Sequence, residues 1–210
     1  MRPCGPVDSG TSQVLPFQVG GSGVPAYQNV RINGSVILAP TGGADSIAGD
    51  LFVETGSLLI NDASTAADLR IAGDLNVTSI FQLAGQPHAL TVHRHATFDG
   101  PTATGFLPAG SLRVKGDFTQ GSTFSTQSFV PDAAFVVYLD SIGDVIFATP
   151  TTSRFSTLQI TETGAVRTLL TDVEVGGTMS FNADGGATLQ SPVLGASGTH
   201  RLTVNGVTQG

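Results

Sequence analysis

One short phrase recurs along this 210-residue chain and constrains its fold more than any other feature. It alternates apolar and polar residues around a central glycine, as in LRIAGDLNV at residues 69–77. The related segments LTVHRHATF at 90–98 and LRVKGDF at 112–118 follow at steps of 21 and 22 residues. Period-two alternation is typical of a strand with one buried face, and periods of this size are typical of repeat proteins. We therefore expect a stack of similar units.

The phrase occurs four more times, and each of these copies has a glycine at its centre. These copies are VRINGSVIL at 30–38, DSIAGDLFV at 45–53, VEVGGTMSF at 173–181 and the start of a last copy at 202–206. Glycine permits tight bends and close backbone approach, so we predict turn glycines at Gly34, Gly49, Gly73, Gly116, Gly177 and Gly206. Two weaker copies of the phrase, near Leu139 and Ile160, lie in the long interval between Gly116 and Gly177. The 15-residue step from Gly34 to Gly49 indicates strands on neighbouring faces of one coil, or an irregular end.

These patterns predict an all-β protein, a right-handed parallel β-helix (β-solenoid) with coils of about 20–25 residues. Helical repeats are disfavoured because no segment keeps apolar residues at helical spacing over ten positions. We expect about seven to nine coils over residues 29–210, preceded by an irregular entry segment or linker at 1–28. A single coil could not offset the entropy of ordering its own backbone, which is why such units must stack. The abrupt last copy suggests a fragment of a longer chain.

The charge pattern excludes several classes of partner. The net charge is −7, only 12% of residues are charged, and the basic residues are one lysine and scattered arginines. Nucleic-acid binding needs clustered basic residues, and so does an anionic membrane surface, so we expect neither. No 18-residue apolar run is present, so membrane insertion is not expected. Cys4 is the single cysteine, which excludes an intramolecular disulfide.

The phrase L-x-V-x-G-D-L, with the stretch at 155–181, resembles the repeats of large secreted bacterial surface proteins. Its style is similar to that of autotransporter passengers and filamentous adhesins, and the resemblance covers roughly residues 29–210. It implies a right-handed parallel β-helix and an extracellular or cell-surface location. The scarcity of charge and the many Thr, Ser and Gly residues favour the same location, although no apolar signal-peptide core lies near the N-terminus.

The position after the central glycine holds Asp50, Asp74, His95 and Asp117 in successive copies. If the copies stack in register at the strand spacing of about 4.8 Å, His95 lies between Asp74 and Asp117. We predict a solvent-facing structural ladder of Asp74, His95 and Asp117, in which the histidine relieves repulsion between the carboxylates. A cation site made by the aspartates and a set of unrelated exposed residues are the alternatives.

The HRH sequence at 93–95 places two histidines on one face of a strand. Two histidines are one ligand short of a catalytic zinc site with three protein ligands, so no metal and no cofactor are expected. Arg94 occupies the position of the central glycine. Because a buried unpaired arginine would be costly, we expect Arg94 to project from a bent corner, rather than a locally distorted coil.

No set of residues in the chain matches an enzyme. Glycoside hydrolysis needs two carboxylates beside a cleft, but the Gly-His-Gly and Arg-x-Lys signatures of polygalacturonase-type β-helices are missing, as is a G-x-S-x-G elbow. We therefore expect a non-enzymatic structural or adhesive module, a rigid stalk or spacer of a secreted or surface-attached bacterial protein.

The partner expected for such a module is a protein or glycan surface ligand, recognised by the loops at 40–46, 61–68, 100–111 and 182–200. Three alternatives remain open at this point. The first is a self-polymerising solenoid of the bactofilin kind, with end-to-end self-association. The second is a polysaccharide lyase or hydrolase on a β-helix, and the third is a trimeric phage or injection-machine fibre.

Overall fold

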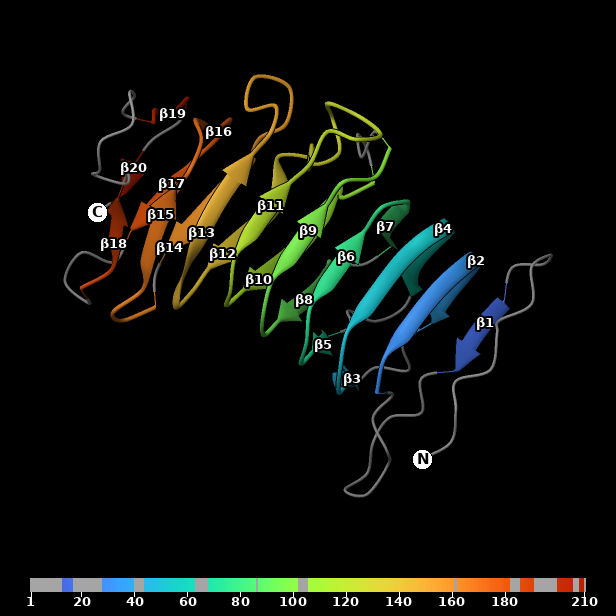
Figure 1. Ribbon diagram of the computed structural model, residues 1–210. Helices are drawn as coiled ribbons and strands as arrows, with labels where there is room; N and C mark the ends of the chain where they lie inside the picture. The colour runs from blue at the N-terminus through green and yellow to red at the C-terminus, as the bar shows by residue number, and fades with distance from the viewer. Residues whose placement is uncertain are drawn as a thin grey trace.

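The computed structural model is an all-β solenoid, with no helix among the residues that it describes. The residues that it describes are 13–16, 28–39, 44–62, 68–85, 87–101, 106–160, 162–181, 186–190, 200–205 and 208–209. Parallel strands stack in about six turns, which confirms the predicted fold class (Figure 1). Six turns are fewer than the seven to nine expected, because some copies of the repeated phrase are different corners of one coil. Within the described residues no helix is long and apolar enough to cross a membrane.

Each coil begins on a first face, which is an eight-stranded parallel sheet. Its strands in chain order are β3 (Ala44–Ile47), β5 (Asp68–Ile71), β8 (His88–Val92), β10 (Ala109–Val114), β12 (Ala134–Leu139), β14 (Thr157–Ile160), β17 (Met179–Phe181) and β20 (Thr208–Gln209). Successive coils therefore contribute successive strands to this sheet.

The chain then turns a first corner onto a second face, which is also parallel. The second face contains β2 (Val30–Ala39), β4 (Leu51–Asp62), β6 (Leu75–Val77), β9 (Ala96–Phe98), β11 (Phe118–Gln120), β13 (Ile142–Phe147), β15 (Val166–Leu169) and β18 (Thr188–Gln190). The long strands β2 and β4 continue beyond this face. Residues 51–53 of β4 pair with β6, whereas residues 57–62 pair with β7 (Ile80–Gly85).

The continuation of β2 and β4 forms a third face together with β7 and β1 (Gln13–Pro16). β1 lies within the segment 1–28 and pairs in parallel with residues 36–39 of β2. Toward the other end of the stack, the third part of the coil is β16 (Val173–Val175), which pairs with β19 (Leu202–Val204). In the middle coils, loops at 121–133 and 148–156 take this place.

Inward-facing apolar side chains form one cluster that runs through the stack from Ile32 to Ala187. Phenylalanines from successive coils contact one another along it. Ring centroids lie 5.9 Å apart for Phe98 and Phe118 and 5.5 Å apart for Phe118 and Phe147. Phe118 also packs against Phe129 and Phe155, each at 4.9 Å. The core is therefore continuous from coil to coil, and such aromatic contacts add to the burial of apolar area.

Glycine is required at the first corner because the coils approach closely there. A Cβ atom on Gly73 would lie 2.7 Å from the backbone of Gly49, and one on Gly116 would lie 2.6 Å from the backbone of Arg94. A Cβ atom on Gly49 would lie 2.0 Å from the carbonyl oxygen of Gln28. Backbone atoms of the preceding coil thus fill the space that a side chain would need.

The remaining glycines of the repeated phrase do not lie at the first corner, so the copies of the phrase do not stack in one column. Gly34 lies inside β2 and pairs with Gly56, whose φ of +79° suits glycine, at the bend onto the third face. Gly177 lies between β16 and β17, where the chain returns to the first face. Gly206 lies outside the described residues. The alternating phrase signals a corner but does not encode which of the three corners it forms.

Candidate functional site

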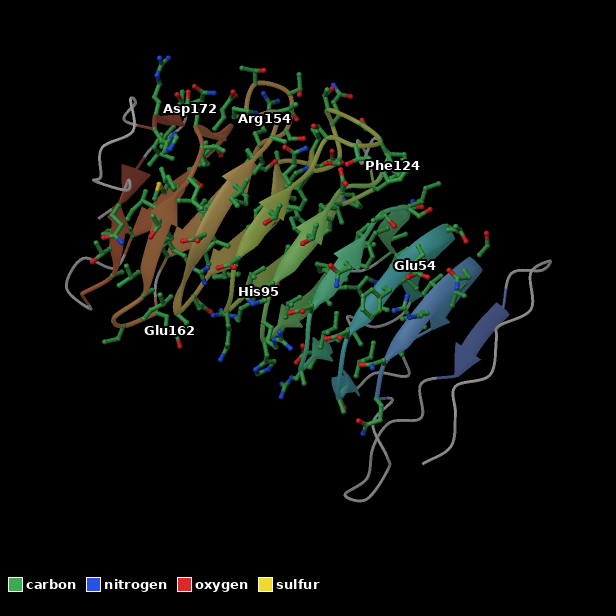
Figure 2. The ribbon with its side chains drawn as sticks, viewed as in Figure 1. Glu54, His95, Phe124, Arg154, Glu162 and Asp172 are labelled. Atoms are coloured by element: carbon green, nitrogen blue, oxygen red, sulfur yellow. The ribbon has the colours of Figure 1, made fainter. Side chains whose placement is uncertain are left out.

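A ladder of hydrogen bonds runs along the first corner, on the edge where Figure 2 labels His95. The acceptor in each step is the side chain of the residue that directly precedes a strand of the second face. It accepts a hydrogen bond from the backbone N–H of the equivalent residue in the next coil. The bonds run from Asp50 N to Asn29 Oδ1 (2.8 Å), from Asp74 N to Asp50 Oδ1 (2.8 Å), from His95 N to Asp74 Oδ1 (3.1 Å), from Asp117 N to His95 Nδ1 (3.0 Å) and from Asp144 N to Asp117 Oδ1 (2.9 Å).

His95 lies between Asp74 and Asp117 in this ladder. Its Nδ1 atom is 3.0 Å from the backbone nitrogen of Asp117 and 2.9 Å from Oδ2 of the same residue. One ring nitrogen cannot serve both contacts at once. It accepts from the N–H when it carries no proton, and it donates to the carboxylate when it does. The side chains of His95 and Asp117 are about half exposed, so solvent reaches this contact whether or not Nδ1 carries a proton.

Sequence reasoning placed Asp74, His95 and Asp117 in one column but missed what connects them, which is the backbone amide of each following residue. It also missed Asn29 and Asp144, the first and last members of the ladder. A signal was present, because each of these two residues comes directly before an alternating apolar segment, as Asp50 and Asp74 do.

Arg94 projects from the corner, and its side chain is 59% exposed. Its Nε atom lies 3.4 Å from Oδ1 of Asp74, the oxygen that also accepts from the backbone of His95. His93 is exposed next to it. In the part of the chain that the structure describes, no group of three or more His, Cys, Asp or Glu residues is arranged to hold a metal ion.

A second polar cluster docks the loops 121–133 and 148–156 onto the opposite edge. The amide of Gln120 is fully buried; its Nε2 donates to Ser128 Oγ at 2.8 Å and its Oε1 accepts from Thr149 N at 3.1 Å. The carbonyl of Thr126 accepts from the hydroxyls of Thr149, Thr152 and Ser153 at 2.7–2.9 Å. These bonds hold the two loops together and leave Phe124 at the tip, 63% exposed (Figure 2).

Buried charge is concentrated at the first corner between β12 and β13. Arg167 of β15 is fully buried and reaches across two coils, where Nη2 donates to the carbonyl of Val114 at 2.9 Å and Nη1 donates to the carbonyl of Gly116. Its side chain passes Gly143, on which a Cβ atom would lie 2.6 Å from Nη1. Burial lowers the pKa of Arg167 to about 10, opposed most strongly by the negative charge of Asp140, so the group stays protonated at neutral pH.

Asp140 is the acidic member of this cluster, and its residue surface is 1% exposed. Its Oδ2 atom accepts from the guanidinium of Arg113. That guanidinium also stacks on the ring of Tyr138, 4.4 Å from the ring centroid. Sequence reasoning missed both Arg167 and Asp140. The alternation of Ala165, Arg167 and Leu169 on one parity was the available signal, because the two apolar residues point inward.

The structure describes only part of the loops that were predicted to bind a partner. Residues 40–43, 63–67, 102–105, 182–185 and 191–199 lie outside the described residues. Residues 44–46, 109–111 and 188–190, which were expected in loops, belong to β3, β10 and β18. They are strands because they pair in register with neighbouring coils.

Comparison of the chain with protein-family models, with curated proteins and with solved structures finds no match in any of the three. Function must therefore be argued from the geometry of this chain.

Proposed function

We propose that this chain is a non-enzymatic structural module, a rigid spacer or adhesive stalk in a secreted or surface-attached bacterial protein. The observation that carries the proposal is that a single apolar core and a side-chain ladder both continue from coil to coil. Since each coil is bound to the next inside and at its corner, the stack resists bending and keeps a fixed length.

The composition supports an extracellular setting for such a spacer. Only 12% of residues are charged and the chain has one lysine, as in the bacterial surface repeats that its phrases resemble. In that setting we expect the full reading frame to carry an export signal and an anchoring segment, and the exposed loops to contact a protein or glycan. Sequencing the gene on both sides checks this part of the proposal, and a full-length protein without an export signal would contradict it.

Spin labels placed along the corner test the rigid spacer directly. In a Cys4→Ser background, the exposed residues Gln28 and Glu162 are replaced by cysteine and labelled. They are six coils apart, so a spacing of about 4.8 Å per coil predicts a separation of about 29 Å before the label linkers are added. We expect a single narrow distance distribution in pulsed electron resonance.

A matched pair shorter by one coil is Ala48 with Glu162, both exposed. Its mean distance is expected to be shorter by about 4.8 Å, with the same width. Broad distributions, or equal means for the two pairs, would show that the stack bends or is not regular and would remove the basis for a spacer.

A further inference from the structure

Two buried side-chain polar atoms in the described part of the chain lack a hydrogen-bond partner, one at the corner between β12 and β13 and one on an arginine of β15 that reaches across this corner. They are Oδ1 of Asp140 and Nε of Arg167. Their residues are 1% and 0% exposed. Native proteins leave few buried polar groups unpaired, because such a group has lost its water and gained nothing in return. Two unpaired atoms in one corner therefore point to a shared ligand.

The carbonyl oxygen of Val114 brings these two residues together. It accepts from the backbone N–H of Asp140 at 3.0 Å and from Nη2 of Arg167 at 2.9 Å. Nε–H lies on one edge of the planar guanidinium together with one of the two N–H groups of Nη2. The other carboxylate oxygen of Asp140 is held by Arg113. Among the described residues, no direct hydrogen bond joins Arg167 to this carboxylate.

We propose that one water molecule is bound between Arg167 and Asp140, where it accepts a hydrogen bond from Nε–H and donates one to Oδ1. The chemistry of the two atoms selects this ligand. An anion would accept from Arg167 but be repelled by Asp140, and a cation would bind Asp140 but be repelled by Arg167. Water both donates and accepts, and buried waters commonly serve polar groups left unpaired in this way. Immobilising it costs less than leaving two buried groups unpaired.

This water site joins three successive coils at a corner that is two residues longer than the corner of the coil before it. In the coils before it, three residues separate the strands of the first and second faces, as at 93–95 and 115–117. Between Leu139 and Val145, the partners of Val114 and Phe118 in the next coil, there are five residues, and Ser141 among them has a φ of 62°. The water completes a polar path from the surface at Arg113, through Asp140, to Arg167 and the carbonyls beneath it. The inference concerns how the stack is held together and does not depend on the proposed function.

Two measurements on the unaltered protein test the site. A high-resolution crystal structure is expected to show density for a water within hydrogen-bond distance of both Nε of Arg167 and Oδ1 of Asp140. In solution, the Nε–H proton of Arg167 is expected to show a cross-peak to a long-lived water in nitrogen-edited nuclear magnetic resonance spectra. The Nε–H of the exposed Arg94 is the internal control and should show no long-lived water.

An Arg167→Lys variant keeps the positive charge and loses Nε, so the bound water should be lost. An Asp144→Asn variant alters a neighbouring carboxylate outside the site, so the water should be retained. Absence of density and cross-peak in the unaltered protein would overturn the proposal. Water at only one of the two atoms, or a direct bond between Nε and Oδ1, would overturn it as well. These measurements on the unaltered protein suffice if the Arg167→Lys variant does not fold.

Discussion

The residues of the corner ladder share one chemical property although their types differ. Asn29, Asp50, Asp74 and Asp117 each present Oδ1, and His95 presents Nδ1. Each of these acceptor atoms is bonded to Cγ, so it sits at the same distance from the backbone. What the corner selects is therefore an acceptor at this position, and negative charge is incidental to it.

This view predicts how His95 can be replaced. His95→Ala removes the acceptor of the Asp117 N–H and should lower the free energy of unfolding by about 1 kcal/mol. His95→Asn restores an acceptor on Cγ and should stay within about 0.5 kcal/mol of the unaltered protein. Urea unfolding at pH 8 measures both, with the exposed neighbour His93→Ala as control. Equal losses for His95→Ala and His93→Ala would show that the ladder bond contributes nothing.

Arg167 should be far less tolerant of replacement. Arg167→Met leaves the carbonyls of Val114 and Gly116 without their buried donor and removes a positive charge that interacts with Asp140, so we expect a loss of about 3–5 kcal/mol. Arg70→Met is the matched control, because Arg70 is exposed and pairs with Asp68 on the surface. That variant should lose less than about 1 kcal/mol. Thermal or urea unfolding distinguishes the two, and similar losses would mean that Arg167 acts only as a surface charge does.

At the scale of the strand and its corner, the repeated phrase carries most of the information. The alternation at 69–77, 90–98 and 112–118 predicts strands whose inward residues are buried in the structure, among them Leu75, Val92 and Phe118. The glycine in the phrase reports that two coils approach closely. At Gly73 the approach is so close that only a hydrogen atom fits.

Gly73→Ala and Gly34→Ala form a matched pair of corner substitutions. A Cβ atom on Gly73 would lie 2.1 Å from Oδ1 of Asp50, whereas one on Gly34 has no atom within 4 Å. We expect Gly73→Ala to lower the free energy of unfolding by about 1–3 kcal/mol through overpacking. Gly34→Ala should be neutral or raise it by up to about 1 kcal/mol, because alanine restricts the unfolded chain. A loss at Gly34 equal to that at Gly73 would contradict this account of the corners.

The sequence could predict the strands and the solenoid, but not the assignment of corners. Gly34 and Gly177 carry the same local phrase as Gly73 because every corner needs the same short-range geometry. Which corner a copy forms depends on the length of chain between copies, and that length varies, from 21 to 27 residues between ladder partners. The candidate site was visible in part. The column of Asp74, His95 and Asp117 follows from the register of the copies. The burial of Arg167 could be predicted only from its inward position in the alternating pattern, against the general rule that arginine is rarely buried.

At the scale of the whole molecule, each coil is stabilised by the coils on either side of it. The strands of the first face pair only with their neighbours in the stack, as β10 does with β8 and β12. Stability in such a chain is close to a sum of nearest-neighbour terms. Coils with two stacked neighbours are therefore more stable than coils near an edge of the sheet.

Hydrogen exchange should reveal this gradient. Backbone amides of β8, β10 and β12 are expected to exchange more slowly than those of β3, which is the edge strand of the first face. Exchange followed by mass spectrometry or nuclear magnetic resonance measures the difference. Uniform protection from β3 to β12 would indicate that the stack opens only as one unit.

The corner ladder also limits how such a molecule can change in evolution or in engineering. Each member accepts from the next, so a deletion that displaces one corner residue breaks its bonds to the coils on either side. Deleting or duplicating one entire coil leaves the remaining pairs intact. The reach of this protein is therefore adjustable only in increments of one coil height, and its variants should form a series of discrete lengths.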